Sequence, residues 1–157
     1  MYSALLRADA AGCDLTALRL GICGGAPIAG DVIRALEHKI PSLVIRQGYG
    51  LSETASISTF NVIARHSKPL SAGKPILGMQ LRVVGQDGKE LPAGPQHMGE
   101  IVLRGHSVMK GYYNDSKATA EAFRDGWLHT GDLGYRDDDG DLFVVGRKDD
   151  VVEKTGS

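Results

Sequence analysis

Apolar and polar positions in the first half of the chain follow two different periods. Residues 18–23 alternate apolar with small or polar side chains, which is typical of a strand, and residues 31–39 show helical spacing. The apolar positions on one face of this predicted helix are Val32, Ile33, Leu36 and Ile40. Pro41 ends the helix, and the apolar run at residues 43–45 suits a buried parallel strand. This strand–helix–strand order predicts an α/β fold class.

The second half of the chain consists of short apolar segments separated by turn signals. Asp87-Gly88 is a hairpin-turn dipeptide, and Asp138-Asp139-Gly140 marks another turn. A short helix is predicted over residues 115–123, capped by Asp115 or Ser116. Short strands are predicted at residues 80–84, 100–104 and 142–145. This half therefore reads as a small antiparallel β subdomain, or partial barrel. We place the α/β unit in residues 1–65 and the β-rich unit in residues 66–148.

The composition is that of an ordinary globular protein. The chain has 157 residues, of which 42% are hydrophobic and 24% charged, and its net charge is -1. Scattered Lys and Arg residues argue against nucleic-acid binding. No apolar run approaches the roughly 20 residues of a transmembrane helix, and the N-terminus lacks the features of a secretory signal. Cys13 and Cys23 form no CxxC pair and are expected to be buried reduced thiols, so a cytoplasmic protein is predicted.

The strongest local signal lies at residues 47–54, directly after a predicted buried strand. Ligands of open α/β sheets bind beyond the carboxyl ends of strands, and the glycines here allow close approach of a ligand. Tyr49 offers an aromatic face for a base, Ser52 a hydroxyl for a phosphate, and Glu53 an oxygen ligand for Mg²⁺. The alternative is a strand-to-helix turn capped by Ser52.

Two further segments carry candidate chemistry. Asp132 lies between glycines, where a carboxylate can accept hydrogen bonds from ribose hydroxyls, or can form a common Asx turn. Arg147 can bridge a phosphate or ribose with its planar guanidinium, or can belong to a solvated charged turn. The residues with the spacing that opens a calcium-binding loop are Asp137, Asp139 and Asp141. Leu142 stands where such a loop needs glycine, so we expect no calcium site.

Five segments in order resemble the adenylate-forming (AMP-binding) superfamily, which includes acyl-CoA synthetases, luciferases and peptide-synthetase adenylation domains. They are Gly24–Pro27, Tyr49–Glu53, Gly99–Tyr113, Gly126–Gly134 and Gly146–Asp149. The sequence looks most like a fatty-acyl-CoA synthetase, and the resemblance runs from about Asp14 onward. It implies the C-terminal part of an α/β sheet of the N-terminal adenylation domain, followed by the β subdomain.

The resemblance implies a nucleotide-binding role for three side chains. Tyr49 would stack on adenine, Asp132 would bind both ribose hydroxyls, and Arg147 would contact the ribose or a phosphate. The other implied nucleotide-binding positions are Gly24, Gly25, Ala26, Gly48 and Gly50. The turn at residues 24–26 would line the adenine and acyl pocket.

The resemblance also implies catalytic and hinge residues. Glu53 would hold magnesium, and Ser52, where the family usually has Thr, would contact phosphate. Asp149 stands at the family's hinge position, and residues 149–157 would be the hinge to a C-terminal domain. Glu153 departs from the pattern, because a Lys is usual near that position.

The implied reaction is carboxylate adenylation with ATP and Mg²⁺, followed by thioester formation with CoA. The implied partners are a small carboxylic acid, with a fatty acid expected, together with ATP and CoA. The family's Ser/Thr/Gly-rich phosphate loop and C-terminal catalytic Lys do not occur in this sequence. We therefore expect an internal fragment that is inactive alone. Two alternatives are a non-catalytic AMP- or adenylate-binding module and an oligomeric structural remnant, since an open sheet edge would favour a homo-oligomer.

Overall fold

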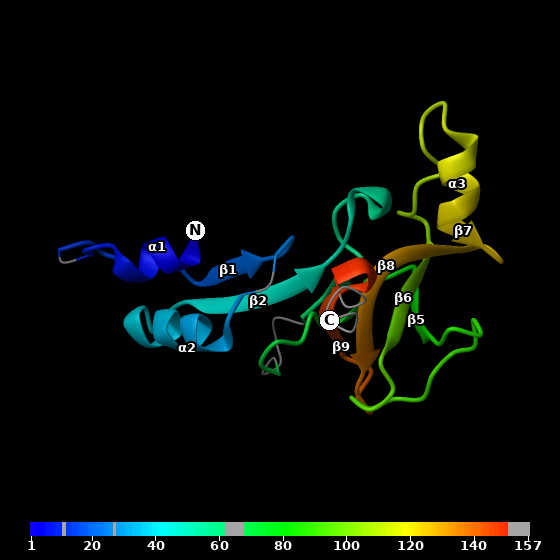
Figure 1. Ribbon diagram of the computed structural model, residues 1–157. Coiled ribbons are helices and arrows are strands. Elements are labelled where there is room, and N and C mark those ends of the chain that lie inside the picture. Colours follow the sequence, from blue (N-terminus) through cyan, green and yellow to red (C-terminus); the bar gives the residue numbers. More distant parts are fainter. Residues whose placement is uncertain (11, 27, 62–67, 151–157) are drawn as a thin grey trace.

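The computed structural model describes residues 1–10, 12–26, 28–61 and 68–150. Its first part is a layer of strands with two helices packed on it, and its second part is a curled antiparallel sheet (Figure 1). This arrangement confirms the predicted fold class, a strand–helix–strand unit followed by an antiparallel half-barrel.

The predicted strand–helix–strand unit forms as expected. Strands β1 (Leu20–Cys23) and β2 (Val44–Tyr49) pair in parallel, with Leu20 opposite Val44. Helix α2 (Gly30–Lys39) connects them, and helix α1 (Tyr2–Arg7) packs beside α2. The sheet continues in antiparallel fashion through β3 (Thr59–Phe60) and β4 (Lys74–Pro75). The short 3-10 helix η1 (Ser52–Thr54) follows β2.

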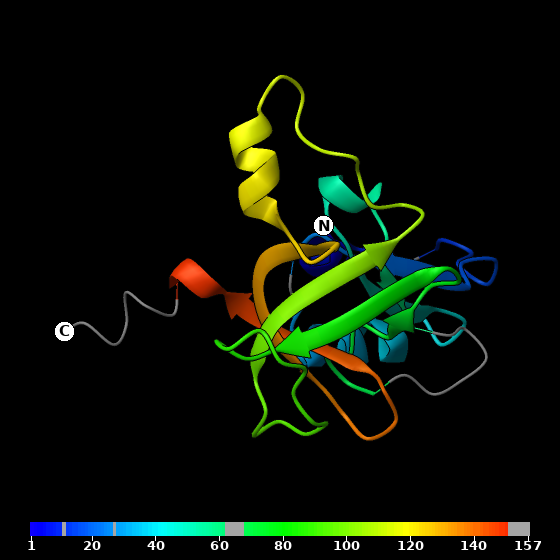
Figure 2. The same ribbon diagram turned by 90° about the vertical axis from the view of Figure 1, so that its right-hand side faces the viewer.

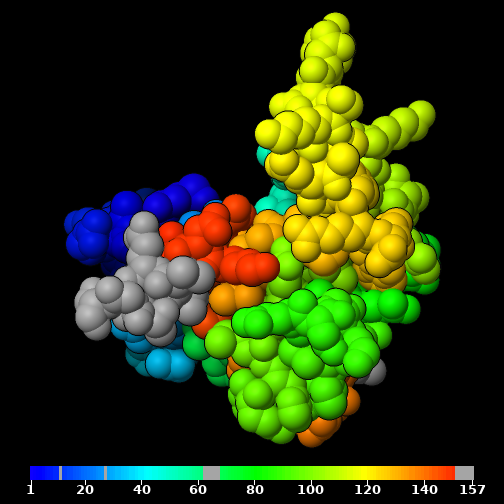
Figure 3. Space-filling view, turned by 45° about the vertical axis from the view of Figure 1, so that its right-hand side comes forward, coloured from blue at the N-terminus to red at the C-terminus, as the bar shows by residue number. Residues whose placement is uncertain are grey.

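The second sheet is antiparallel throughout and curls around its own core (Figure 2). Its strands are β5 (Met79–Val84), β6 (Gly99–Gly105), β7 (Phe123–Arg124), β8 (Trp127–Arg136) and β9 (Leu142–Arg147). Helix α3 (Ser116–Ala122) projects from one end of this sheet in the space-filling view (Figure 3). The Asp115 side chain caps α3 by accepting a hydrogen bond from the Ala118 N–H at 2.8 Å, which confirms one of the two predicted caps.

Strand β8 is the one long element that the hydrophobic pattern did not predict. Gly131 and Gly134 lie within it, although glycine is unfavourable within a strand. At Gly134, however, a Cβ atom would stand 2.5 Å from the Phe143 carbonyl oxygen of β9. Glycine therefore allows the close approach of the paired strands here, instead of ending the strand.

Each sheet has its own hydrophobic core. In the first, Leu36, Ile40, Leu43 and Ile45 are buried. In the second, the buried residues are Ala72, Met79, Leu81, Val83, Ile101, Leu103 and Leu142. Tyr49, although it belongs to β2, packs against this second core. The end of β2 therefore lies where the two sheets meet.

The outer edge of β1 has no strand partner among the described residues. Leu20 is 38% exposed and Ile22 is 54% exposed there. The Tyr2 hydroxyl donates to the Ile22 carbonyl at 2.6 Å and so covers one backbone acceptor of β1. The apolar side chains of this strand remain uncovered.

The structure tests what the composition predicted for the cysteines and for membrane-spanning helices. Cys13 and Cys23 are free thiols, but Cys13 is exposed, so its predicted burial is wrong. It lies in the loop between α1 and β1, where its N–H bonds the Ala10 carbonyl at 3.1 Å. No helix formed by the described residues is long and apolar enough to cross a membrane.

Candidate functional site

Tyr49, Asp132 and Arg147 come together from β2, β8 and β9. The Tyr49 hydroxyl donates to Asp132 Oδ2 at 2.6 Å, and Arg147 Nη1 donates to Asp132 Oδ1 at 3.2 Å. The Asp132 side chain is 9% exposed, whereas that of Arg147 is 54% exposed. A nearly buried carboxylate therefore lies between an aromatic hydroxyl and a cation that still faces solvent.

Asp132 owes its position to a β-bulge in strand β8. Glu100 pairs with Leu133 and Val102 with His129, so residues 130–132 stand opposite the single residue Ile101. The Thr130 hydroxyl donates to the Ile101 carbonyl at 2.7 Å and accepts from the Asp132 N–H at 3.1 Å. Bulges of this kind turn a side chain away from its regular direction. Asp132 is thus part of a strand, and the Asx-turn alternative is wrong.

The surroundings of Tyr49 keep its hydroxyl protonated. Burial, reinforced by the hydrogen bond to Asp132, raises the pKa of the Tyr49 hydroxyl far above its ordinary value of 10.0. Tyr49 therefore remains a neutral donor to the Asp132 carboxylate throughout the biochemical pH range. An ionised carboxylate offers about four acceptor positions, and Tyr49 and Arg147 occupy two, which leaves capacity for ligand hydroxyls.

The predicted glycine positions lie at the carboxyl ends of β1 and β2. Gly24 packs against β2, since a Cβ on it would lie 3.3 Å from the Gly48 carbonyl oxygen. At Gly50 a Cβ would lie 2.1 Å from the Ser56 carbonyl oxygen. Packing of the chain's own backbone thus accounts for these two glycines. Gly25, with a φ of +77°, and Ala26 are exposed in the turn after β1.

Ser52 and Glu53 lie together in η1, beyond the end of β2. Ser52 is exposed and does not cap the helix, because Leu51 is the N-cap and its N–H bonds Thr54 Oγ1 at 3.0 Å. Glu53 Oε1 accepts from the Tyr112 hydroxyl at 2.8 Å, which raises the pKa of Tyr112. One partly buried carboxylate fits the way Mg²⁺ is usually held, by one or two carboxylates together with substrate phosphates.

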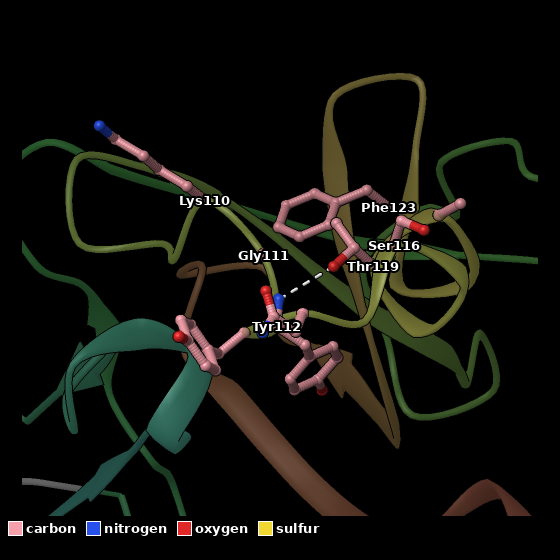
Figure 4. A pocket seen from close by; sticks show the side chains of 9 residues that line it. Lys110, Gly111, Tyr112, Ser116, Thr119 and Phe123 are labelled. Carbon is pink, nitrogen blue, oxygen red and sulfur yellow. Dashed lines mark hydrogen bonds between the residues drawn. The ribbon is translucent and has the colours of Figure 1, made fainter.

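Tyr112 also borders an open pocket of about 690 Å³ between residues 110–114 and α3 (Figure 4). Its N–H donates to Thr119 Oγ1 at 2.9 Å, the dashed bond in Figure 4, and Lys110 extends away from the other side chains. None of the predicted site residues lines this pocket. The pocket therefore adjoins the Glu53 carboxylate through Tyr112 and does not coincide with the Tyr49–Asp132–Arg147 cluster.

The remaining predictions concern the hinge residues and the three aspartates at positions 137, 139 and 141. Asp149 is exposed just after β9, and Glu153 and most of the predicted hinge lie outside the described residues. The three aspartates at positions 137, 139 and 141 surround the Lys68 ammonium group. No metal-binding group of three or more His, Cys, Asp or Glu side chains occurs within the described part of the chain.

Three residues that contact the predicted site received no role from the sequence. Thr130 bonds the Asp132 backbone, Tyr112 bonds Glu53, and Glu100 accepts from the N–H of Gly131 at 3.2 Å. Glu100 had a detectable signal, since it is an acidic residue directly before the apolar run Ile101–Leu103. The other two gave none, because Thr and Tyr are common strand and loop residues.

Comparisons with known proteins identify the family of this chain. The sequence matches the family described as "AMP-binding enzyme" over residues 1–113. A 2-succinylbenzoate–CoA ligase from Bacillus cytotoxicus is 42% identical over 142 residues, which is 90% of this chain and 28% of that protein. 4-Coumarate–CoA ligase 1 from Glycine max is 36% identical over 149 residues, which is 91% of this chain and 50% of that protein.

A solved structure is similar as well. The anthranilate CoA ligase AuaEII, in complex with anthranoyl-AMP, superposes with a TM-score of 0.85 at 31% identity. The match covers 95% of this chain and 28% of that one. This chain spans half or less of the length of these relatives.

Proposed function

The chain belongs to the AMP-binding enzymes of the adenylate-forming superfamily, and from this premise we propose that it forms part of the nucleotide site of an ATP-dependent acyl-CoA synthetase. The observation that carries the proposal is the Tyr49–Asp132–Arg147 cluster. It joins β2 to the paired strands β8 and β9, with 83 positions between Tyr49 and Asp132, and it holds a desolvated carboxylate beside an aromatic ring and a cation. Those are the groups that a ribose, an adenine and a phosphate require.

Each site residue has a proposed task. The Asp132 carboxylate accepts the ribose hydroxyls, the Tyr49 ring stacks on adenine, and Arg147 contacts the ribose or the phosphate. The turn at residues 24–26 and the backbone at Gly48 and Gly50 border the adenine and the acyl group. Holding the nucleotide at several points fixes the α-phosphate relative to the acid, which is the main contribution that positioning makes to such a reaction.

The proposed chemistry has two steps. A carboxylate oxygen attacks the α-phosphorus of ATP, and the bond to the leaving pyrophosphate breaks to give an acyl-adenylate. The sulfur of CoA then attacks the acyl carbon, AMP leaves, and the thiol proton is released to solvent. Ser52 contacts a phosphate oxygen, and Glu53 would hold Mg²⁺, which supplies positive charge near the phosphates when bound. Asp149 would mark the hinge between the two steps.

The finer substrate assignment is also a proposal. We propose a small carboxylic acid, with a fatty acid as the specific expectation, in a cytoplasmic protein. The relatives described above are named for 4-coumarate, 2-succinylbenzoate and anthranilate, which are aromatic carboxylic acids. Because the chain spans only part of their length, we propose that it does not complete the reaction alone.

The proposal is tested by calorimetric titration of the chain with AMP and with a non-hydrolysable acyl-adenylate analogue. Asp132→Ala should weaken the binding of both ligands markedly, because it removes the ribose acceptor. The matched control is Asp138→Ala, which removes an exposed aspartate near the same sheet and should leave binding unchanged. Folded parent protein that binds neither ligand, or equal binding by the parent and Asp132→Ala, would refute the site. Release of pyrophosphate from ATP by the chain would refute the proposed inactivity.

A second candidate is a role as an oligomeric structural element. The open edge of β1, with Leu20 and Ile22 exposed, favours it. This candidate does not need nucleotide binding, so a folded chain that self-associates without binding AMP would support it over the first.

A further inference from the structure

Glu100 lies at the centre of a polar cluster behind the proposed ribose site. One carboxylate oxygen, Oε1, accepts from the Gly131 N–H at 3.2 Å. The other, Oε2, lies 3.2 Å from His129 Nδ1 and 3.5 Å from Lys148 Nζ. The Glu100 side chain is only 13% exposed, and that of His129 is 15% exposed. A carboxylate this deep in a sheet needs compensating partners, and here all of them come from β8 or directly follow β9.

Two of these partners are the immediate neighbours of proposed site residues. Gly131 precedes Asp132, and Lys148 follows Arg147. A single carboxylate therefore contacts both segments that carry the charged pair of the site. Asp132 and Arg147 also pair across β8 and β9, so the contacts of Glu100 and those of the site lie on the same two segments.

The backbone between Glu100 and Asp132 is the bulged part of β8. Residues 130–132 lie opposite one residue of β6, and such an irregular segment lacks the regular ladder bonds of a strand. Gly131 has a φ of +72°, which glycine adopts without strain. Its N–H has the Glu100 carboxylate as acceptor in place of a backbone carbonyl. The side chain of Glu100 thus completes the hydrogen bonding of the bulge that directs Asp132.

The charge of Glu100 is maintained in the folded protein. Burial alone would raise the pKa of this carboxyl group, but His129, Lys148 and the Gly131 N–H together hold it below its ordinary value. The ionised carboxylate accepts the hydrogen bond from the Gly131 N–H and lies beside the Lys148 ammonium group.

We propose that Glu100 is a positioning residue that fixes the direction of the Asp132 carboxylate toward the ribose hydroxyls. This role rests on the proposed nucleotide site, and it adds a specificity determinant that touches no ligand. It makes a distinctive prediction: loss of Glu100 weakens the binding of ligands that carry ribose hydroxyls, and spares ligands that lack them.

The experiment compares AMP with 2′,3′-dideoxyadenosine monophosphate by calorimetry, using the full 157-residue chain. Glu100→Ala should reduce AMP affinity by roughly ten-fold and leave the dideoxy ligand unchanged. Glu100→Gln keeps an oxygen acceptor for the Gly131 N–H but loses the charge, so it should fall between the parent and Glu100→Ala. Glu100→Ala combined with Asp132→Ala should lose no more affinity than Asp132→Ala alone, because the two act through one contact.

The matched control is Glu90→Ala, which removes another carboxylate with two arginine partners, Arg82 and Arg136. It should leave the preference for AMP over the dideoxy ligand intact. Amide hydrogen exchange provides a readout that needs no ligand: the Gly131 N–H should exchange faster in Glu100→Ala, while amides of β5 stay protected.

The outcomes separate this inference from the proposed function. Equal loss of affinity for both ligands, or no loss for either, in a folded Glu100→Ala protein overturns the positioning role while the nucleotide site stands. Unchanged exchange at Gly131 overturns it as well. A parent protein that does not prefer AMP over the dideoxy ligand overturns the ribose assignment of Asp132, and the role of Glu100 with it.

Discussion

The two sheets of the molecule differ in how completely they bury themselves. The first sheet has a small core and an open edge at β1, where Leu20 and Ile22 are exposed. The second sheet curls around a larger core, and each of its strands is paired within the described chain. The first sheet thus encloses the smaller core, with four buried residues against seven in the second, although Val144 and Val145 of β9 are also exposed.

The same difference appears in what each sheet gives to the candidate site. The first supplies the glycine turn at residues 24–26 and the segment from Tyr49 to Glu53. The second supplies the charged side chains Asp132 and Arg147. The site therefore depends on the joins between the sheets. They include the buried Tyr49–Asp132 hydrogen bond, the bonds from Tyr112 and Met109 to Glu53, the backbone bonds of Leu142 with Ala72 and Gly73, and the contacts of Lys68.

Removing the buried Tyr49–Asp132 hydrogen bond should have the largest effect on stability. Tyr49→Phe keeps the aromatic ring, and so any stacking on adenine, but leaves Asp132 without its closest donor. Loss of one partner of a buried charged acceptor costs about 1–3 kcal/mol, so the free energy of unfolding should fall by about that amount in urea titrations. The control is Tyr113→Phe, at a 94% exposed residue, with no expected change. Equal stability of Tyr49→Phe and the parent would show that the sheets are held together elsewhere.

The sequence predicted the strand–helix–strand unit of the first sheet and strands β5, β6 and β9 of the second, because period and turn residues carry that information. Helix α2 and strand β2 were clear from apolar spacing, and α3 from its cap. Strand β8 was missed because Gly134 allows close strand packing and Gly131 allows a bulge, and only the paired structure reveals both. Exposure of Cys13 was missed because its short loop has no apolar period.

The candidate site was predictable residue by residue only through resemblance to a family. No local pattern indicates that Tyr49 and Asp132 meet, since they are 83 positions apart. The bulge that directs Asp132 also has no sequence period, because it depends on Thr130 and Glu100 from two strands. Side chains that act on the site through the backbone are therefore the part that required the structure.

Placing a charge on the open edge of β1 should change the free energy of unfolding less, but it should clearly reduce self-association of the chain. We predict that the parent chain self-associates through β1. Ile22→Lys should shift it toward the monomer in analytical ultracentrifugation, because a charge on an edge strand opposes pairing. The free energy of unfolding should change by no more than about 0.5 kcal/mol, as is usual for exposed positions. Leu77→Lys, at a 97% exposed residue away from β1, is the control. A monomeric parent at high concentration, or equal shifts in both variants, would contradict this interface.

Removing the ion pairs of Lys68 should have the smallest effect on stability, and this effect should disappear at low pH. The Lys68 ammonium contacts the carboxylates of Asp137 and Asp139, and lies 3.9 Å from Asp141. Burial would raise the pKa of Asp137, but the hydrogen bonds from Lys68 and from the Asp141 and Asp139 N–H groups outweigh it and hold the pKa below 3.8. Because this pKa is lowered on folding, its stabilisation is present above pH 3.8 and is lost as pH falls through the folded-state value.

Lys68→Met removes the cation and keeps an unbranched side chain. It should therefore lower the free energy of unfolding slightly at neutral pH, and the gap from the parent should close below pH 3.8. Urea titrations at a series of pH values measure this gap. Lys89→Met, which removes the exposed pair with Asp87, provides the matched control within a single turn. If the difference in free energy of unfolding between the parent and Lys68→Met stays constant into strong acid, the lysine acts through the packing of its aliphatic chain. The contact of Lys68 with the three aspartates would then not be electrostatic.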